Sequence, residues 1–119
     1  MSNINDVLNQ MLQTDGAMAA AVVDSDSGLM LGGVGNVFDL ELASAGNTEV
    51  IRAKFKTMRS LNLDDSIEDI LITLDTQYHI ITLSSKSPGL FLYFVLDKSK
   101  GNLALARRAA KEATARLEI

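Results

Sequence analysis

The longest hydrophobic pattern in the chain runs from Val37 to Leu63 and has the period of an α-helix. At about 100° per residue, bulky side chains gather on one face, which predicts a helix packed on a sheet. This face holds Leu40, Ser44, Ile51, Phe55 and Met58. Asp39 precedes it and is the expected N-cap. Roughly 22 helical residues span about 33 Å, so the helix has more surface than one small sheet needs.

A second stripe on the same helix consists of small or apolar residues, interrupted by one amide and one lysine. Its members are Ala43, Gly46, Asn47, Val50, Ala53, Lys54 and Thr57, and Leu61 continues the stripe toward the end of the helix. Small residues allow a second backbone to approach closely, and a glycine inside a helix costs about 1 kcal/mol. We therefore expect this stripe to form a homodimer interface. Burial under the protein's own terminus is the alternative.

The opposite side of this helix is polar and contains Glu41, Thr48, Arg52, Lys56 and Arg59. The basic residues Arg52, Lys56 and Arg59 follow one another at i, i+4 and i+7 and so form one continuous surface. This surface is our candidate for binding an acidic protein partner. A solvated helix face explains the same pattern.

The remaining patterns predict two more helices and five strands. Helical spacing runs from Ile4 to Leu12, and a closing helix capped by Asp97 or Ser99 points Leu103, Ala106, Ala110, Ala113 and Leu117 inward. Strands are expected at residues 17–23, 29–34, 67–74, 78–83 and 90–96, separated by polar turns. The predicted element order is αββαβββα, with one sheet and helices on its faces.

Composition narrows the class of protein. The 119 residues are 47% apolar and 22% charged, which predicts a single domain over residues 1–119. The net charge of −4 disfavours nucleic acid as a partner. The absence of cysteine excludes disulfides and thiolate metal sites. No signal peptide pattern and no apolar run of about 18 residues is present, so we expect a cytoplasmic protein without membrane insertion.

Three features that resemble functional motifs have simpler explanations. The segment 24–28, DSDSG, begins like a calcium loop but lacks the later ligands, which favours a turn. Gly32, Gly33 and Gly35 lack the lysine and the spacing of a phosphate-binding loop. His79 is the only histidine and has no second metal ligand or positioned nucleophile nearby in sequence. We therefore predict no catalytic residues, no cofactor and no metal site.

Three stretches together resemble the Roadblock/dynein light-chain family: AMAAAVVDSDSGLML, DILITLDTQYHIITLSS and LFLYFVLDKSKGNLALARRAAKEATARL. The resemblance covers nearly the whole chain and consists of packing patterns, with no catalytic signature among them. It implies an α+β fold with a five-stranded antiparallel sheet in the order 2-1-5-4-3. The long middle helix would cover one face of this sheet and the terminal helices the other. It also implies a dimer in which the middle helices pack together and the third strands extend the sheet.

Members of this family regulate or scaffold small Ras-like GTPases, including as a bacterial GTPase-activating protein of cell polarity, and serve as dynein subunits. The resemblance therefore implies a non-enzymatic homodimer that binds a small Ras-like GTPase. No arginine finger is carried over, so Arg52 and Arg59 are candidates for partner contact only. The alternatives are a small-ligand sensor with a pocket near His79 and Tyr93, and a purely structural interaction module.

Overall fold

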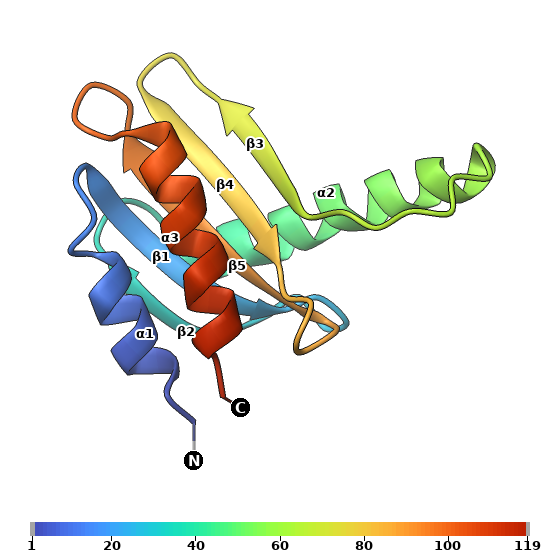
Figure 1. The fold of residues 1–119 in the computed structure, drawn as a ribbon, viewed down its shortest axis with the longest axis horizontal. Coiled ribbons are helices and arrows are strands. Elements are labelled where there is room, and N and C mark those ends of the chain that lie inside the picture. Colours follow the sequence, from blue (N-terminus) through green and yellow to red (C-terminus); the bar gives the residue numbers. More distant parts are fainter. Residues whose placement is uncertain (1, 119) are drawn as a thin grey trace.

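The computed structural model describes residues 2–118 of the chain. The helices are arranged on the two faces of one sheet, as Figure 1 shows. The elements in chain order are α1 (Ile4–Met11), β1 (Ala17–Asp24), β2 (Leu29–Gly35), α2 (Leu40–Ser60), β3 (Asp69–Thr73), β4 (Gln77–Leu83), β5 (Leu90–Asp97) and α3 (Leu103–Arg116).

The strands form one antiparallel sheet in the order β2-β1-β5-β4-β3. β5 lies in the middle, as expected for the most apolar strand, and Phe91 to Leu96 are at most 1% exposed. β2 and β3 are the two edge strands. The predicted element order, strand order and antiparallel pairing are all confirmed.

Alternation along the strands divides the core into two layers. One layer joins α1 and α3 to the sheet through residues such as Leu8, Phe94 and Ala110. The other joins α2 to the opposite face through Ile51, Tyr93 and their neighbours. The two terminal helices therefore share one face and α2 occupies the other, as Figure 1 shows and as the sequence predicted.

Glycine in β2 permits close packing of the first helix. A Cβ atom at Gly32 would lie 2.6 Å from Cγ2 of Ile4 in α1, which is closer than real contacts allow. The glycine-rich segment is part of strand β2 up to Gly35. Its composition therefore reflects the fit of α1 on the sheet in addition to the freedom of a connecting loop.

Two predicted boundaries were wrong. β3 spans Asp69–Thr73, so the predicted strand residues at 67 and 68 belong to the connection from α2, and residue 74 lies beyond the end of the strand. The N-cap of α3 is Asn102, whose side chain accepts a hydrogen bond from the backbone N–H of Leu105. Asp97 instead accepts hydrogen bonds from Ser99 N–H and Oγ and closes a turn after β5, so neither predicted cap lies at the helix.

The prediction that Thr48 lies on the polar, solvated face of α2 was wrong, because this residue is only 1% exposed. Its hydroxyl donates to the carbonyl of Ser44, 2.8 Å away, and the β1–β2 turn at Gly28 lies against it. The Asp39 cap is confirmed, because its carboxylate accepts from the N–H of Leu42 at 3.0 Å. Among residues 2–118, no helix is long and apolar enough to cross a membrane.

Candidate partner-binding surface

The predicted dimer stripe on α2 is largely uncovered in the single chain. Gly46 has no atom within 4 Å of the position its Cβ would take, and Val50 is 39% exposed. Ala53, Lys54 and Thr57 are exposed, while Ala43 and Asn47 are partly buried. The stripe is therefore free to meet another molecule, and no terminus of the chain within residues 2–118 covers it.

A groove runs between this stripe and the edge of the sheet, because α2 packs mainly on β1 and β2. The groove has a volume of about 520 Å³ and is lined by Val50, Ala53, Lys54, Thr57, Ile67, Asp69 and Ile70. Sequence reasoning identified its α2 wall and missed the residues from β3 and the connection before it. The alternation in the β3 sequence could have indicated Ile70, whereas the approach of residue 67 depends on tertiary structure.

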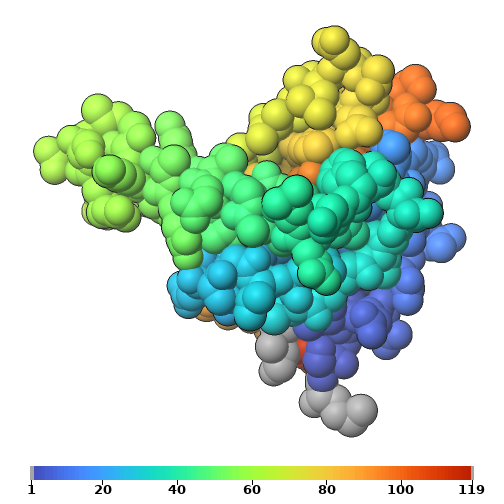
Figure 2. All heavy atoms as spheres, turned by 180° about the vertical axis from the view of Figure 1, so that it is seen from behind, coloured from blue at the N-terminus to red at the C-terminus, as the bar shows by residue number. Residues whose placement is uncertain are grey.

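The C-terminal end of α2 stands clear of the sheet. Figure 2 shows this end of the helix and the following connection projecting sideways beyond the rest of the molecule. The helix ends in a Schellman motif, in which Asn62 adopts a φ of 57° and the N–H of Leu63 donates to the carbonyl of Met58. Leu61 and Leu63 are 62% and 51% exposed, so the projecting end is apolar at its tip.

A polar cluster lies beside the N-terminal half of α2. The Tyr93 hydroxyl lies 2.9 Å from Nδ1 of His79, and Nε2 of His79 lies 2.8 Å from the Gln77 side-chain oxygen. Because an amide oxygen only accepts, Nε2 donates and Nδ1 accepts from the tyrosine. Burial lowers the pKa of His79 and raises the pKa of Tyr93, the latter opposed by a hydrogen bond with Asn47. Both ring nitrogens of His79 thus have partners within the fold.

Phe38 lies over this cluster, with its ring centroid 5.8 Å from that of His79. The phenylalanine is 41% exposed, and Leu42 on the next turn is 70% exposed. These two residues give the N-terminal end of α2 an apolar surface, which sequence reasoning had not identified. A cavity of about 620 Å³ lies elsewhere and is lined by neither His79 nor Tyr93.

The basic set on α2 divides into two parts. Arg52 pairs with Glu49 at 2.8 Å and donates to the backbone carbonyls of Ser25 and Asp26 in the β1–β2 turn. The side chains of Lys56 and Arg59 form no hydrogen bond or ion pair with any of the residues 2–118. Arg52 therefore ties α2 to the turn, and Lys56 and Arg59 remain available to a partner.

Two ion pairs attach the third helix to the start of β3. Arg107 donates to both carboxylate oxygens of Asp69 at 2.8 and 3.0 Å, and Lys111 lies 2.6 Å from Glu68. These pairs position the edge strand from the face opposite α2. No group of three or more potential metal ligands gathers anywhere in the described part of the chain.

The structure is similar to solved Roadblock-type proteins. MglB of Myxococcus xanthus superposes with a TM-score of 0.82 at 16% identity, covering 95% of this chain and 89% of that one. An MglB structure with a tetrameric arrangement gives 0.81 at 15% identity, covering 94% and 82% of the two chains. A Roadblock/LC7 domain from Streptomyces avermitilis gives 0.79 at 12% identity, covering 92% and 89%.

No family model matches the sequence, and no curated protein matches it either. The likeness therefore resides in the three-dimensional arrangement, over nearly the full length of each chain. It confirms at the level of the fold the resemblance that the packing patterns of the sequence indicated. This chain has the fold of the Roadblock/LC7 domains and of MglB.

Proposed function

We propose that this protein is a non-enzymatic homodimer that binds a small Ras-like GTPase and regulates or scaffolds it. The observation that carries the proposal is the uncovered stripe and groove beside α2 in a chain with the Roadblock/LC7 fold. An apolar surface of this kind, next to an open sheet edge, is typical of a site that another protein covers.

The spacing of the stripe supports an antiparallel pair of α2 helices. Its seven positions are symmetric about Val50 and follow the three-and-four spacing of helices that pack side by side. Two copies related by a two-fold axis at Val50 bring Ala43 opposite Thr57 of the other copy, and Gly46 opposite Lys54. The open space at Gly46 then accommodates the apolar stem of the lysine.

The same arrangement gives the exposed ends of α2 a role. In an antiparallel pair centred on Val50, the projecting tip with Leu61 and Leu63 reaches the partner helix near Phe38 and Leu42. All four side chains are at least 41% exposed in the single chain. Burying large apolar side chains supplies the main favourable free energy of association. The two β3 edges would pair alongside, extending the sheet across the axis.

The proposed GTPase contact uses Lys56 and Arg59, which the dimer would present twice. Both lie on the side of α2 away from the dimer stripe and have no ion pair within the described residues. Electrostatic complementarity of such a surface favours an acidic patch on the partner and increases the rate of association. MglB and the Roadblock/LC7 domains share the fold, and the family resemblance in the sequence supports a GTPase as the partner.

The experiment is an affinity pull-down from the native lysate under GTP-loaded and GDP-loaded conditions, with captured proteins identified by mass spectrometry. We expect a Ras-like GTPase enriched in one nucleotide state. A Lys56→Ala/Arg59→Ala variant should lose the GTPase and keep the dimer mass. Gly46→Arg, which fills the space for the second helix, should give a monomer. Failure to capture any GTPase in either state contradicts the proposal.

A further inference from the structure

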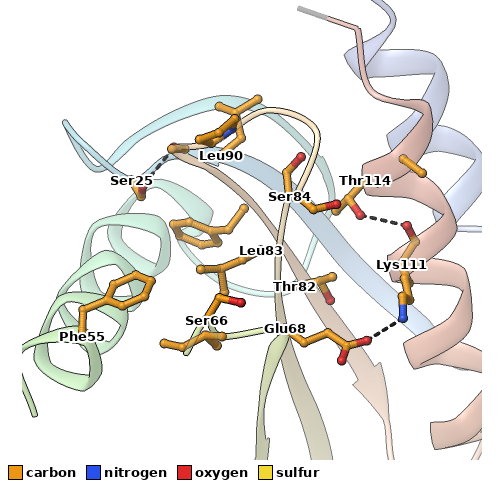
Figure 3. A pocket seen from close by; sticks show the side chains of 16 residues that line it. Ser25, Phe55, Ser66, Glu68, Thr82, Leu83, Ser84, Leu90, Lys111 and Thr114 are labelled. Atoms are coloured by element: carbon orange, nitrogen blue, oxygen red, sulfur yellow. Dashed lines mark hydrogen bonds and ion pairs between the residues drawn. The ribbon is translucent and has the colours of Figure 1, made fainter. Parts of the chain in front are cut away.

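A cavity other than the groove beside α2 lies at the end of β4. It has a volume of about 620 Å³, within the range of small-molecule sites. As Figure 3 shows, its walls come from α2, the connection before β3, the end of β4 with the loop that follows, and α3. Segments far apart in sequence therefore meet around one space.

One side of the cavity is apolar. Phe55 of α2, Leu83 of β4 and Leu90 at the start of β5 lie on this side in Figure 3, and Ile67 and Phe91 line the same space. These side chains offer a hydrophobic surface to the body of a ligand. Burial of apolar surface here would supply binding energy without specificity.

The other side is polar and contains an unpaired hydroxyl. Thr82 is 3% exposed, and its Oγ1 has no hydrogen-bond partner, alone among the buried side-chain polar atoms of the described residues. A buried hydroxyl without a partner is unfavourable and rare in folded proteins. Ser84 accepts from the N–H of Ser87 at 2.9 Å, and its own proton has no acceptor among the described residues.

The ammonium group of Lys111 lies at the edge of the polar side. The Nζ of Lys111 lies 2.6 Å from Oε1 of Glu68 and forms no other ion pair within the described residues. The hydrogen bond with Glu68 raises the pKa of Lys111, so the ammonium keeps its charge at neutral pH. Glu68 is 69% exposed and can turn into solvent when another anion takes the lysine. The hydroxyl of Thr114 already donates to the carbonyl of Lys111.

The polar side offers free hydrogen-bond donors to a ligand. The protons of Thr82 and Ser84 have no acceptor, and the ammonium of Lys111 has two N–H groups left after its bond to Glu68. A ligand that presents hydrogen-bond acceptors satisfies these donors, and a negative charge suits the lysine best. The apolar wall opposite requires a hydrophobic body on the same molecule.

We propose that this cavity binds a small amphipathic carboxylate. Its apolar body lies against Phe55 and Leu83, and its carboxylate accepts hydrogen bonds from Thr82, Ser84 and Lys111. The proposal goes beyond GTPase binding. Its polar wall lies on the α3 side of the sheet, away from the α2 stripe, so either proposal can fail without the other.

The test is a titration of the full chain followed by amide chemical shifts in heteronuclear NMR. Octanoate and hydrocinnamate are the probes, with octanamide and octylamine as matched controls that change only the head group of octanoate. We expect saturable shifts around Thr82 and Lys111 with both carboxylates, weaker shifts with the amide, and none with the amine. Absence of saturable shifts with either carboxylate, or equal binding of the amine, would overturn the proposal.

Three variants separate a binding role from a structural one. Thr82→Val keeps the shape and removes the hydroxyl, so octanoate should bind about three- to tenfold more weakly. The melting temperature without ligand should stay the same or rise, because an unpaired buried hydroxyl is lost. Lys111→Met should weaken binding about two- to fivefold, because the lysine is 70% exposed and solvent screens its charge. Arg116→Met removes a charge from the same helix on the side that faces α1, outside the cavity wall, and should leave affinity unchanged.

The variants can also refute the proposal. If Thr82→Val and Lys111→Met bind octanoate as tightly as the unmodified protein, the carboxylate does not meet these groups. A large fall in melting temperature for Thr82→Val without ligand would show that its hydroxyl already has a partner. Either outcome contradicts the assignment of this cavity to a carboxylate.

Discussion

Replacing Val50 by aspartate should dissociate the proposed dimer, because the two-fold axis places this residue next to its own copy. Val50 is 39% exposed in the single chain, and burying this exposed part contributes roughly 0.6–1.2 kcal/mol per copy to the free energy of dimerisation. Two carboxylates about 5 Å apart repel by roughly 3 kcal/mol at an effective dielectric constant of about 20. Together these effects amount to roughly 4–5 kcal/mol, which corresponds to about a thousandfold weaker dimer.

The assay is sedimentation velocity over a concentration series, with Val50→Asn as the matched control. Asparagine has nearly the shape of aspartate without its charge, so it should lose only the apolar contribution, roughly one to two powers of ten. The aspartate dimer should also strengthen as pH falls, because association raises the carboxyl pKa and so binds protons. Equal dissociation constants for the two variants at neutral pH would refute the two-fold at Val50.

Three further predictions concern the fold itself. Ile51 packs in the α2 layer of the core and is 2% exposed, so Ile51→Ala should lower the free energy of unfolding by about 2–4 kcal/mol in a urea titration. Lys56→Ala, at an exposed position of the same helix, should change it by less than about 0.5 kcal/mol. The free energy of unfolding should fall as pH drops below 6.5, because burial lowers the pKa of His79 and the unfolded state then binds the proton more readily. In His79→Gln the melting temperature should depend less steeply on pH over this range. An unchanged dependence would exclude this residue as the cause. Asn102→Ala should cost about 1 kcal/mol by removing the α3 cap, while Asn102→Ser should be nearly neutral; equal losses would show that the cap bond contributes nothing.

Local chemistry was enough to predict most of the fold. The period of the long helix, the cap at Asp39 and the central position of β5 follow from side-chain patterns within a few residues of each element. The antiparallel order required the family resemblance, since alternation alone does not determine which strands pair. The packing of Gly32 against α1 shows that a sequence feature typical of a loop can belong to a strand.

The errors arose where distant segments meet. Thr48 lies on a helical face that periodicity assigns to solvent, and the β1–β2 turn covers it. Arg52 donates to backbone carbonyls of the same turn, more than 20 residues away, so its spacing with Lys56 and Arg59 could not reveal its role. Asn102 was missed because Asp97 and Ser99 have side chains that cap helices equally well. Which residue caps α3 depends on where the turn after β5 ends and the helix begins.

The candidate sites also differ in how far the sequence could predict them. The α2 stripe could be read directly from the sequence, because all seven positions lie on one helix. Its other wall at Ile67 and Ile70, and the cavity around Thr82, bring together residues from several elements. Thr82 is an ordinary strand threonine in the sequence, and its unpaired hydroxyl appears only once β4, β3 and α3 are packed.

The proposed function depends on the dimer through α2, and disulfide cross-linking of Val50→Cys probes that contact without any partner protein. The natural chain has no cysteine, so a single introduced thiol gives no background. Two cysteines across the axis can form a disulfide only when their Cα atoms lie within about 7 Å. Under mild oxidation we expect a covalent dimer for Val50→Cys and mostly monomer for Lys56→Cys on the opposite face of the helix. A monomeric Val50→Cys protein, or equal cross-linking of both variants, would contradict it.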